Sequence, residues 1–243
     1  MKILMMLTSF DKFSEKNKKA GLFPEQFTSP YYILKDAGAD VTLTTPDGGH
    51  PPLNEKNRNP TTAGNSRLRS DLAAQVALHN TFSLRQAAQL DFDALYIAAG
   101  YGVLWDIVEN HYAISIVESM YAAGKPIAAV CHSSSIFCRA RMADGEVLVR
   151  EKSVTGFSNS EEKTSGQSYV VPYSVEDELK RNGGKYSKGL DWEPYVLSDG
   201  LLITGQNPAS SGLTAKTLLN KLKSQGHDLK TDVLQKFGIF ELG

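Results

Sequence analysis

The sequence predicts an α/β fold, a doubly wound and mostly parallel sheet sandwiched by helices. Short apolar runs of strand length recur along the chain, and segments with helical spacing and Gly or Pro residues separate them. These runs are nearly continuous rather than alternating, which is typical of strands buried on both faces of a parallel sheet. The predicted strands are residues 2–7, 41–44, 94–98, 126–130 and 201–204. Their alternation with helical segments indicates repeated βα units.

Two helices can be placed from the signals at their ends. One helix ends at Gly38, a residue that readily terminates helices. It begins either at the pair Ser29-Pro30, an N-cap followed by a first-turn proline, or near Glu25 with a kink at the proline. A second helix is predicted over residues 111–123 and leads into the strand at 126–130.

Two stretches interrupt this pattern and are interpreted as insertions at the sheet edge. They are residues 50–69, rich in Pro, Asn and Thr, and residues 146–198, which include a polar helix-like run at 175–182. We therefore expect a single domain over residues 1–243 with these two insertions. Long irregular segments are often lids or binding loops, so we expect them to cover the site or to mediate dimer contacts. For the first stretch, a surface segment without a function is an equal alternative.

The overall charge favours a small-molecule partner. Twenty-six basic residues against 27 acidic ones leave a formal charge of -1, which provides no broad electrostatic attraction for nucleic acid or an anionic membrane. The apolar start of the chain is too short for a signal peptide or a membrane span. Cysteine is sparse, so we expect a reducing cytoplasmic location.

Cofactor and metal signatures are missing from the sequence. No glycine-rich dinucleotide fingerprint or phosphate-binding loop follows a strand. The histidines lack close metal-ligand spacing; they lie at positions 50, 79, 111, 132 and 227. We therefore expect chemistry that needs no cofactor and no metal.

Cys131 is the candidate nucleophile. An apolar strand runs into the polar, small-residue turn Cys131-His132-Ser133 and then into a helix. A cysteine on such a sharp turn lies at a helix N-terminus, where free N–H groups and the helix dipole favour the thiolate. His132 can exchange a proton in the physiological pH range. An ordinary buried cysteine with a capping histidine is the alternative, whereas Cys138, about two helical turns later, is expected to be an inert core thiol.

Several segments resemble the ThiJ/PfpI superfamily, which is class I glutamine amidotransferase-like. The similarity is greatest to its branch of glutathione-independent glyoxalases (glyoxalase III) and heat-shock chaperone-like proteins, and it spans nearly the whole chain. The resemblance implies a flavodoxin-like sandwich. The matching segments are residues 2–8, 21–25, 35–41, 46–49, 129–132, 154–157 and 204–208.

The resemblance also implies an acidic partner for the cysteine. A glutamate after the first strand reaches the cysteine in the family, and Glu25 matches that position. A carboxyl group beside a thiolate is useful if it holds a proton, because two adjacent anions repel and one pKa must rise. A solvated glutamate at a helix start is the alternative. Glu161 and Glu162 are not expected to form a paired-carboxylate site, because adjacent helix residues do not share a face.

The predicted pocket residues are Gly100, Tyr101, Ser133 and Asn207. In similar proteins the backbone around Gly100 helps to form an oxyanion pocket, to which the N–H of His132 also contributes. Tyr101 replaces the histidine usual in the family but can still donate a hydrogen bond. Asn207 lies where a strand ends and the last long helix begins, although turn and cap roles explain it equally well. Trp105 is expected chiefly to pack.

The leading functional hypothesis is a cysteine-dependent glyoxalase of the lyase class. It would detoxify methylglyoxal-like 2-oxoaldehydes in a stress response by converting them to 2-hydroxy acids such as D-lactate. Cys131 would attack the aldehyde, and His132 and Glu25 would move the protons. The alternatives are a cysteine amidase or peptidase, and a redox-responsive stress chaperone. A homodimer is expected, since relatives commonly associate.

Overall fold

The computed structural model describes residues 1–13, 18–19, 22–53 and 62–236, with side chains described for residues 1–11, 22–53 and 62–226. Gly21 and the central part of the first predicted insertion, residues 54–61, lie outside the described residues.

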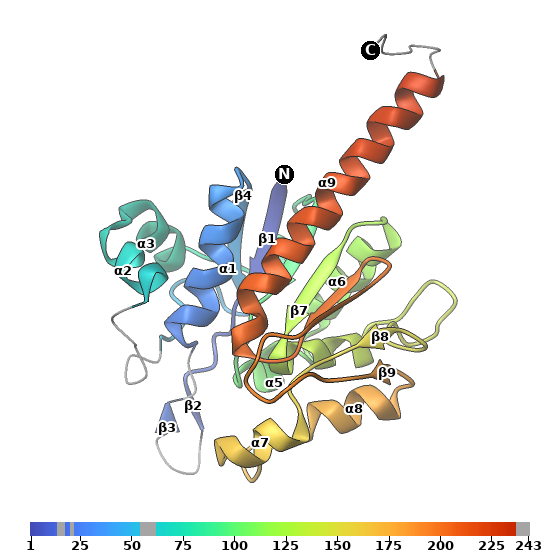
Figure 1. Cartoon of the computed structure of the whole chain (residues 1–243). Helices are drawn as coiled ribbons and strands as arrows, with labels where there is room; N and C mark the ends of the chain where they lie inside the picture. The colour runs from blue at the N-terminus through green and yellow to red at the C-terminus, as the bar shows by residue number, and fades with distance from the viewer. Residues whose placement is uncertain (14–17, 20–21, 54–61, 237–243) are drawn as a thin grey trace.

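A parallel sheet forms the centre of the molecule (Figure 1). Its strands are β1 (Lys2–Met6), β4 (Asp40–Thr45), β5 (Phe82–Ser83), β6 (Ala94–Ile97), β7 (Ile127–Val130), β10 (Val196–Asp199) and β11 (Leu202–Gly205). Within the described residues these seven strands follow the order β10-β11-β7-β6-β1-β4-β5. Only β10 at the edge is antiparallel to its neighbour. The inner order β4-β1-β6-β7-β11 is the flavodoxin-like doubly wound order, as predicted.

Helices cover both faces of this sheet. The helices of the described residues are α1 (Pro24–Asp36), α2 (Ala63–Ser70), α3 (Leu72–His79), α4 (Leu84–Ala87), α5 (Val103–Asp106), α6 (His111–Ala122), α7 (Asn159–Ser165), α8 (Val175–Arg181) and α9 (Ser211–Lys236), with the 3₁₀ helices η2 (Cys131–Cys138) and η3 (Pro208–Ser210). Two short pairs of strands lie outside the main sheet: β2 (Lys12–Phe13) with β3 (Lys18–Lys19), and β8 (Ser153–Val154) with β9 (Lys185–Tyr186).

The side chains of β1 explain why its sequence is continuously apolar. Successive strand residues point to opposite faces of a sheet. Ile3 and Met5 belong to a buried cluster with α1 and α9, whereas Leu4 and Met6 belong to a second cluster with α4 and α6. Each face is closed to solvent, so every position of the strand needs an apolar residue.

The predicted secondary structure is confirmed at most positions. All the predicted strands are present, with ends that differ by at most one residue. The first helix begins at Pro24 and keeps Pro30 in its interior, so the earlier of the two predicted starts is the observed one. The helix predicted at residues 111–123 is α6, and the polar run at 175–182 is α8.

The second insertion lies beside the ends of the strands that carry the site. Helices α7 and α8 lie below the sheet in the view of Figure 1, at the end opposite the N-terminus. The parallel strands run toward this end, because β1 starts at the N-terminus and its parallel neighbours share its direction. Ligands of doubly wound folds bind at the carboxyl ends of the strands.

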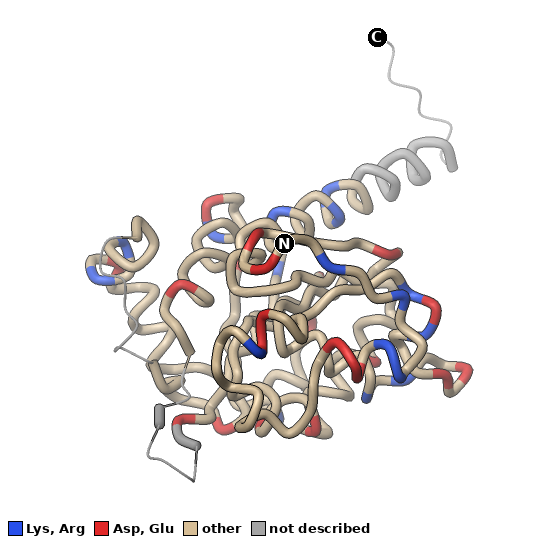
Figure 2. Tube along the Cα trace, turned by 60° about the horizontal axis from the view of Figure 1, so that its bottom comes forward, with Lys and Arg blue, Asp and Glu red and all other residues tan. Residues whose placement is uncertain are grey.

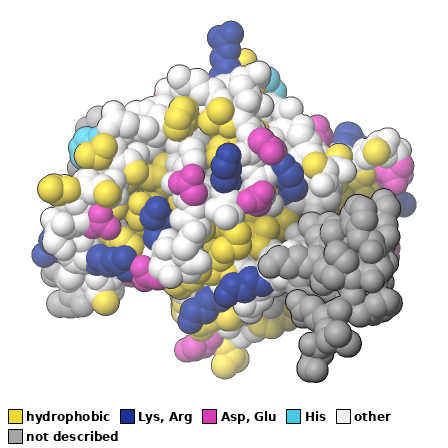
Figure 3. All heavy atoms as spheres, turned by 90° about the horizontal axis from the view of Figure 1, so that it is seen from above, with side chains coloured by type: hydrophobic (Ala, Val, Ile, Leu, Met, Phe, Trp, Pro, Cys, Tyr) yellow, Lys and Arg dark blue, Asp and Glu magenta, His cyan; other side chains and the backbone are white. Residues whose placement is uncertain are grey.

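The surface carries both signs of charge in mixture. Residues of both charges are interspersed among uncharged residues along the chain trace (Figure 2) and over the face seen from above (Figure 3). Among the described helices, none is long and apolar enough to span a membrane.

Candidate active site

Cys131 lies on a sharp turn between β7 and η2. Its φ of 64° is in the left-handed region, which a residue with a Cβ rarely adopts and which marks functional turns of the nucleophile-elbow type. The Ser133 hydroxyl, 2.7 Å from the carbonyl oxygen of Val130, also accepts a hydrogen bond from the N–H of Val130 at 2.9 Å. Ser133 therefore stabilises the turn. The sequence predicted that Ser133 lines the pocket, but it does not line the cavity beside Cys131.

The sulfur of Cys131 lies beside the imidazole of His132. The distance between Sγ and Nδ1 is 3.1 Å, and the other ring nitrogen, Nε2, lies 2.8 Å from Oε2 of Glu162. A carboxylate only accepts hydrogen bonds, so Nε2 carries the ring hydrogen. This tautomer leaves the lone pair of Nδ1 directed at the thiol. The three residues form a Cys-His-Glu chain with the connectivity of a catalytic triad.

Glu162 was not among the predicted catalytic residues, and the structure brings it to the centre of the site. It lies in the first turn of α7, and its other carboxylate oxygen, Oε1, accepts a hydrogen bond from the Tyr101 hydroxyl at 3.0 Å. The Tyr101 hydroxyl also lies 2.9 Å from Oγ of Ser165. Burial raises the pKa of Tyr101, so this phenol stays protonated and acts as a donor.

Glu161 faces another direction, as expected for its neighbour on a helix. Its carboxylate accepts hydrogen bonds from the backbone N–H of Trp192 and from the amide of Asn207, each at 2.8 Å. The two glutamates therefore do not form a paired-carboxylate site. The prediction from the sequence concerns these glutamates only as a pair and places neither beside His132, although a single carboxylate suffices to orient a histidine. The available signal was their place just after the family-like segment 154–157.

The backbone N–H groups of His132 and Gly100 lie near the sulfur and influence its pKa. Burial raises the pKa of the Cys131 thiol, and the nearby carboxylates of Glu161 and Glu162 raise it further. Hydrogen bonds from the N–H groups of His132 and Gly100 act in the opposite direction. Because burial is the largest influence on this pKa, the thiol of Cys131 is protonated. His132 is placed to accept its hydrogen. The predicted N–H pair of Gly100 and His132 is thus present beside the nucleophile.

Cys131 opens into a cavity of about 240 Å³. Aromatic rings and small polar groups form its walls. Its lining residues are Phe23, Gln26, Gly100, Tyr101, Cys131, His132, Phe157, Ser165, Gln167, Trp192 and Pro208. The second predicted insertion supplies four of them, at positions 157, 165, 167 and 192. This insertion therefore forms part of the site, as one of its two predicted roles requires.

Glu25 is not brought to the sulfur. It is exposed at the start of α1, and the neighbouring Gln26 is buried and lines the cavity instead. Successive helix residues are rotated by roughly 100°, so only one of this pair can face the cavity. The predicted role of Glu25 beside the thiol is therefore not supported by the structure. A neutral amide occupies the place where an acid was expected.

Asn207 and Trp105 have structural roles rather than pocket roles. Asn207 is fully buried and caps η3, and its amide binds Glu161 and the carbonyl of Glu193. This is the turn and cap alternative noted from the sequence. Trp105 stacks on Phe10 with ring centroids 5.1 Å apart and does not line the cavity.

Cys138 is a core thiol at the end of η2. Its sulfur contacts the carbonyl oxygen of Glu178 at 3.6 Å, and burial raises its pKa to about 12. Within the described part of the chain, no histidine is bonded to this sulfur, and Cys138 does not line the cavity at Cys131.

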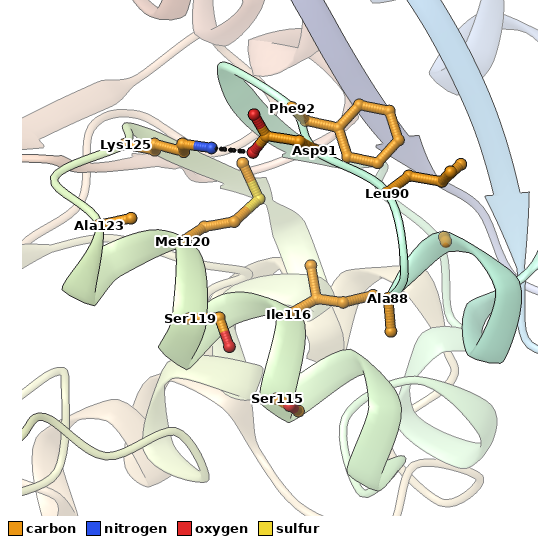
Figure 4. Close-up of a pocket in the computed structure, with 11 residues that line it drawn as sticks. Ala88, Leu90, Asp91, Phe92, Ser115, Ile116, Ser119, Met120, Ala123 and Lys125 are labelled. Atoms are coloured by element: carbon orange, nitrogen blue, oxygen red, sulfur yellow. Dashed lines mark hydrogen bonds and ion pairs between the residues drawn. The ribbon is translucent and has the colours of Figure 1, made fainter.

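A second cavity, of about 260 Å³, lies between α6 and the segment that follows α4 (Figure 4). An ion pair between Lys125 and Asp91 spans its rim. The described residues that line it include neither cysteine nor histidine. Of these two cavities, the one at Cys131 is lined by a cysteine and a histidine.

Most of the chain is similar in sequence to known proteins. A family model, the DJ-1/PfpI family, matches residues 24–221. The glutathione-independent glyoxalase HSP31 of Saccharomyces cerevisiae is 28% identical, over 92% of this chain and 98% of its own length. Glyoxalase 3 of Candida albicans is 26% identical, over 90% of this chain and 97% of its own length.

Solved structures share the fold. The Rapid Encystment Protein 24 KDa of Francisella tularensis superposes with a TM-score of 0.85 at 34% identity, covering 91% of this chain and 98% of its own. Glyoxalase III of Candida albicans superposes with a TM-score of 0.79 at 24% identity, covering 90% and 96% of the two chains. The family model spans well over half of the sequence, and so this chain belongs to the DJ-1/PfpI family.

Proposed function

We propose that this protein is a glutathione-independent glyoxalase, which converts methylglyoxal-type 2-oxoaldehydes to 2-hydroxy acids. The observation that carries the proposal is the chain of contacts from Cys131 Sγ through His132 to Glu162, at 3.1 and 2.8 Å, at the edge of a cavity. Relatives of similar length that bear this activity in their names support it. No other reactant than water is needed, because the aldehyde carbon is oxidised while the neighbouring ketone carbon is reduced.

The first step is addition of the thiol to the aldehyde. His132 Nδ1 accepts the thiol hydrogen as the sulfur bonds to the aldehyde carbon. The oxygen of that carbon gains negative charge, and we assign its stabilisation to the N–H groups of Gly100 and His132 near the sulfur. The imidazolium then returns the proton to this oxygen, which gives a neutral hemithioacetal. Glu162 stabilises the transient positive charge on the ring.

The second step moves a hydrogen between the two substrate carbons. His132, neutral again, removes the hydrogen from the former aldehyde carbon, which gives an enediolate with its charge on the former ketone oxygen. The hydroxyl proton of the former aldehyde carbon passes to this neighbouring oxygen, and His132 returns its own proton to the adjacent carbon. The product is a thioester of the 2-hydroxy acid. Water then attacks the thioester, the carbon–sulfur bond breaks, and the leaving sulfur regains its proton from His132. Atoms balance as one 2-oxoaldehyde plus one water giving one 2-hydroxy acid.

The test is formation of lactate from methylglyoxal in the absence of glutathione. We expect the purified protein to consume methylglyoxal and to release D-lactate, measured by enantiomer-specific lactate dehydrogenases. Methylglyoxal that is left unconsumed, with the protein folded by circular dichroism, would contradict the proposal.

A second candidate is acyl hydrolysis by the same residues. A Cys-His-Glu chain with two N–H groups at the sulfur is also the geometry that amidases and peptidases use. Turnover of amide or peptide substrates that is lost in Cys131→Ala, together with inertness toward methylglyoxal, would favour this candidate. Homodimerisation and a cytoplasmic location remain predictions from the sequence.

A further inference from the structure

Trp192 has an unusual backbone conformation at the edge of the cavity. Its φ is 65°, and it is neither glycine nor asparagine, the residues that adopt this region most readily. The residue is 46% exposed although its side chain is a large aromatic group. The indole lines the cavity and meets Phe157 edge to face, with ring centroids 5.7 Å apart. An unfavourable conformation of this kind persists only where surrounding contacts impose it.

A buried carboxylate imposes it here. Glu161 is fully buried, and it accepts the backbone N–H of Trp192 at 2.8 Å. The same carboxylate accepts the amide of Asn207 at 2.8 Å and the N–H and hydroxyl of Ser158 at 3.1 and 2.8 Å. Hydrogen bonds to an ionised group are strong, and this carboxylate is fully satisfied. The indole is thus held in place beside the cavity by a built network.

The aromatic wall continues from the indole to the reacting residues. Phe157 lies 4.5 Å from the ring of His132, centroid to centroid, and Tyr101 lies 4.2 Å from the same ring. Phe23 completes the aromatic lining. A substrate whose aldehyde reaches Cys131 therefore has its substituent among aromatic rings.

The cavity is larger than methylglyoxal requires. A cavity of about 150 Å³ holds a benzene molecule, and the cavity at Cys131 measures about 240 Å³. Methylglyoxal has fewer heavy atoms than benzene, so it leaves much of this space to water. A phenyl ring carried on the two-carbon dicarbonyl unit fills the space better and buries more apolar surface.

The charges around the cavity select against anionic substituents. Among the described residues that line it, none is Lys or Arg. The carboxylates of Glu161 and Glu162 are hydrogen-bonded to the lining residues Trp192 and His132. A carboxylate on the substrate would find no cation to pair with among the described lining residues.

From these observations we infer that Trp192 is a specificity-determining residue that selects 2-oxoaldehydes with an uncharged aryl substituent. Glu161 is its positioning residue, since it holds the Trp192 backbone. The inference rests on the proposed glyoxalase function and names the substrate class within it. For phenylglyoxal the reaction balances as for methylglyoxal: one aldehyde and one water give one mandelate.

The test compares kcat/KM for phenylglyoxal and methylglyoxal, without glutathione, by chromatography of mandelate and lactate. We expect the wild type to favour phenylglyoxal by roughly tenfold, because an aryl group in an aromatic pocket gives about that discrimination. Trp192→Ala should reduce this ratio about tenfold, mainly through the KM for phenylglyoxal, and Trp192→Phe should keep most of it. Phenylglyoxal with a 4-carboxylate should be a poorer substrate than phenylglyoxal itself.

Leu190→Ala is the matched control. Leu190 is in the same loop and 78% exposed, and its side chain does not line the cavity, so both rates should stay at the wild-type level. The inference would be overturned, and the proposed function left standing, if Trp192→Ala kept the wild-type ratio of the two kcat/KM values. A wild type that favours methylglyoxal would have the same meaning. If methylglyoxal and phenylglyoxal are both inert, the proposed function fails and the inference fails with it.

Discussion

The carboxylate of Glu162 lies 2.8 Å from Nε2 of His132, while the sulfur of Cys131 lies 3.1 Å from Nδ1 of the same ring. The imidazole thus joins an acceptor on one side to a nucleophile on the other. Because this pairing determines which nitrogen carries the hydrogen, Glu162 sets the ability of His132 to act as a base toward the thiol.

Glu162→Gln should lower kcat by roughly a hundredfold, because the amide can donate to Nε2 and favour the tautomer that has no lone pair toward sulfur. Glu25→Gln is the matched control, since Glu25 is exposed and outside the cavity, and it should retain the wild-type kcat. Steady-state kinetics with methylglyoxal measures both. A reversed order, with Glu25→Gln the slower variant, would restore the role that the sequence suggested for Glu25.

Tyr101→Phe should lower kcat about fivefold, because it removes one hydrogen bond, worth about 1 kcal/mol, that holds the Glu162 carboxylate. The two residues act as a unit in this account. The double variant with Glu162→Gln should therefore be no slower than Glu162→Gln alone, in a double-mutant cycle. Strictly multiplicative effects would mean that Tyr101 acts on substrate independently of Glu162.

Alkylation of Cys131 by iodoacetamide should be slow at neutral pH. Its rate should continue to increase with pH even above the pKa of an exposed thiol. Burial raises the pKa of this thiol, and the thiolate is the reacting species. Peptide mass spectrometry across a pH series gives the rate for each cysteine. Cys138 serves as the internal reference and should stay unmodified in the folded protein. A rate at Cys131 that is already maximal near pH 6 would contradict the expected direction.

Asp106 should make the protein less stable as pH rises from about 4 to above 6. Burial raises the pKa of its carboxyl from 3.8 to about 6, although Oδ2 accepts hydrogen bonds from Thr8 and Ser9. The folded state therefore holds this proton more tightly than the unfolded state. The resulting stabilisation is full below the unfolded pKa and is lost as pH rises through the folded pKa, by on the order of 2–3 kcal/mol.

Asp106→Asn removes this titration. The free energy of unfolding of Asp106→Asn relative to wild type, measured in urea at pH 4.5 and pH 7.5, should shift in favour of the variant at the higher pH. A difference between the two proteins that is the same at both pH values would contradict the assignment.

The sequence was sufficient to predict the sheet and the sharp turn on which Cys131 lies. The buried strands are continuous apolar runs because the sheet is covered on both faces, as Leu4 and Met5 illustrate by entering opposite clusters. Cys131 follows such a run directly and is followed by small residues that fit the turn. These are local relationships, in which neighbours along the chain carry the information.

The partners of the nucleophile depend on long-range geometry instead. The rotation of α1 after its start at Pro24 determines whether Glu25 or Gln26 faces the cavity. A helix start shifted by one residue would turn the other side chain toward it. Glu162 reaches His132 from α7, 30 residues further along the chain, through a loop whose path periodicity does not predict. Only the fold brings these groups together.

The most direct test of the central claim compares Cys131→Ala with Cys138→Ala in lactate formation from methylglyoxal without glutathione. Both are buried cysteines of η2, so packing losses are matched, and circular dichroism verifies that each variant is folded. We predict that Cys138→Ala keeps activity near the wild-type level and that Cys131→Ala forms no lactate above the uncatalysed rate. Lactate formation by Cys131→Ala at the wild-type rate would contradict the account.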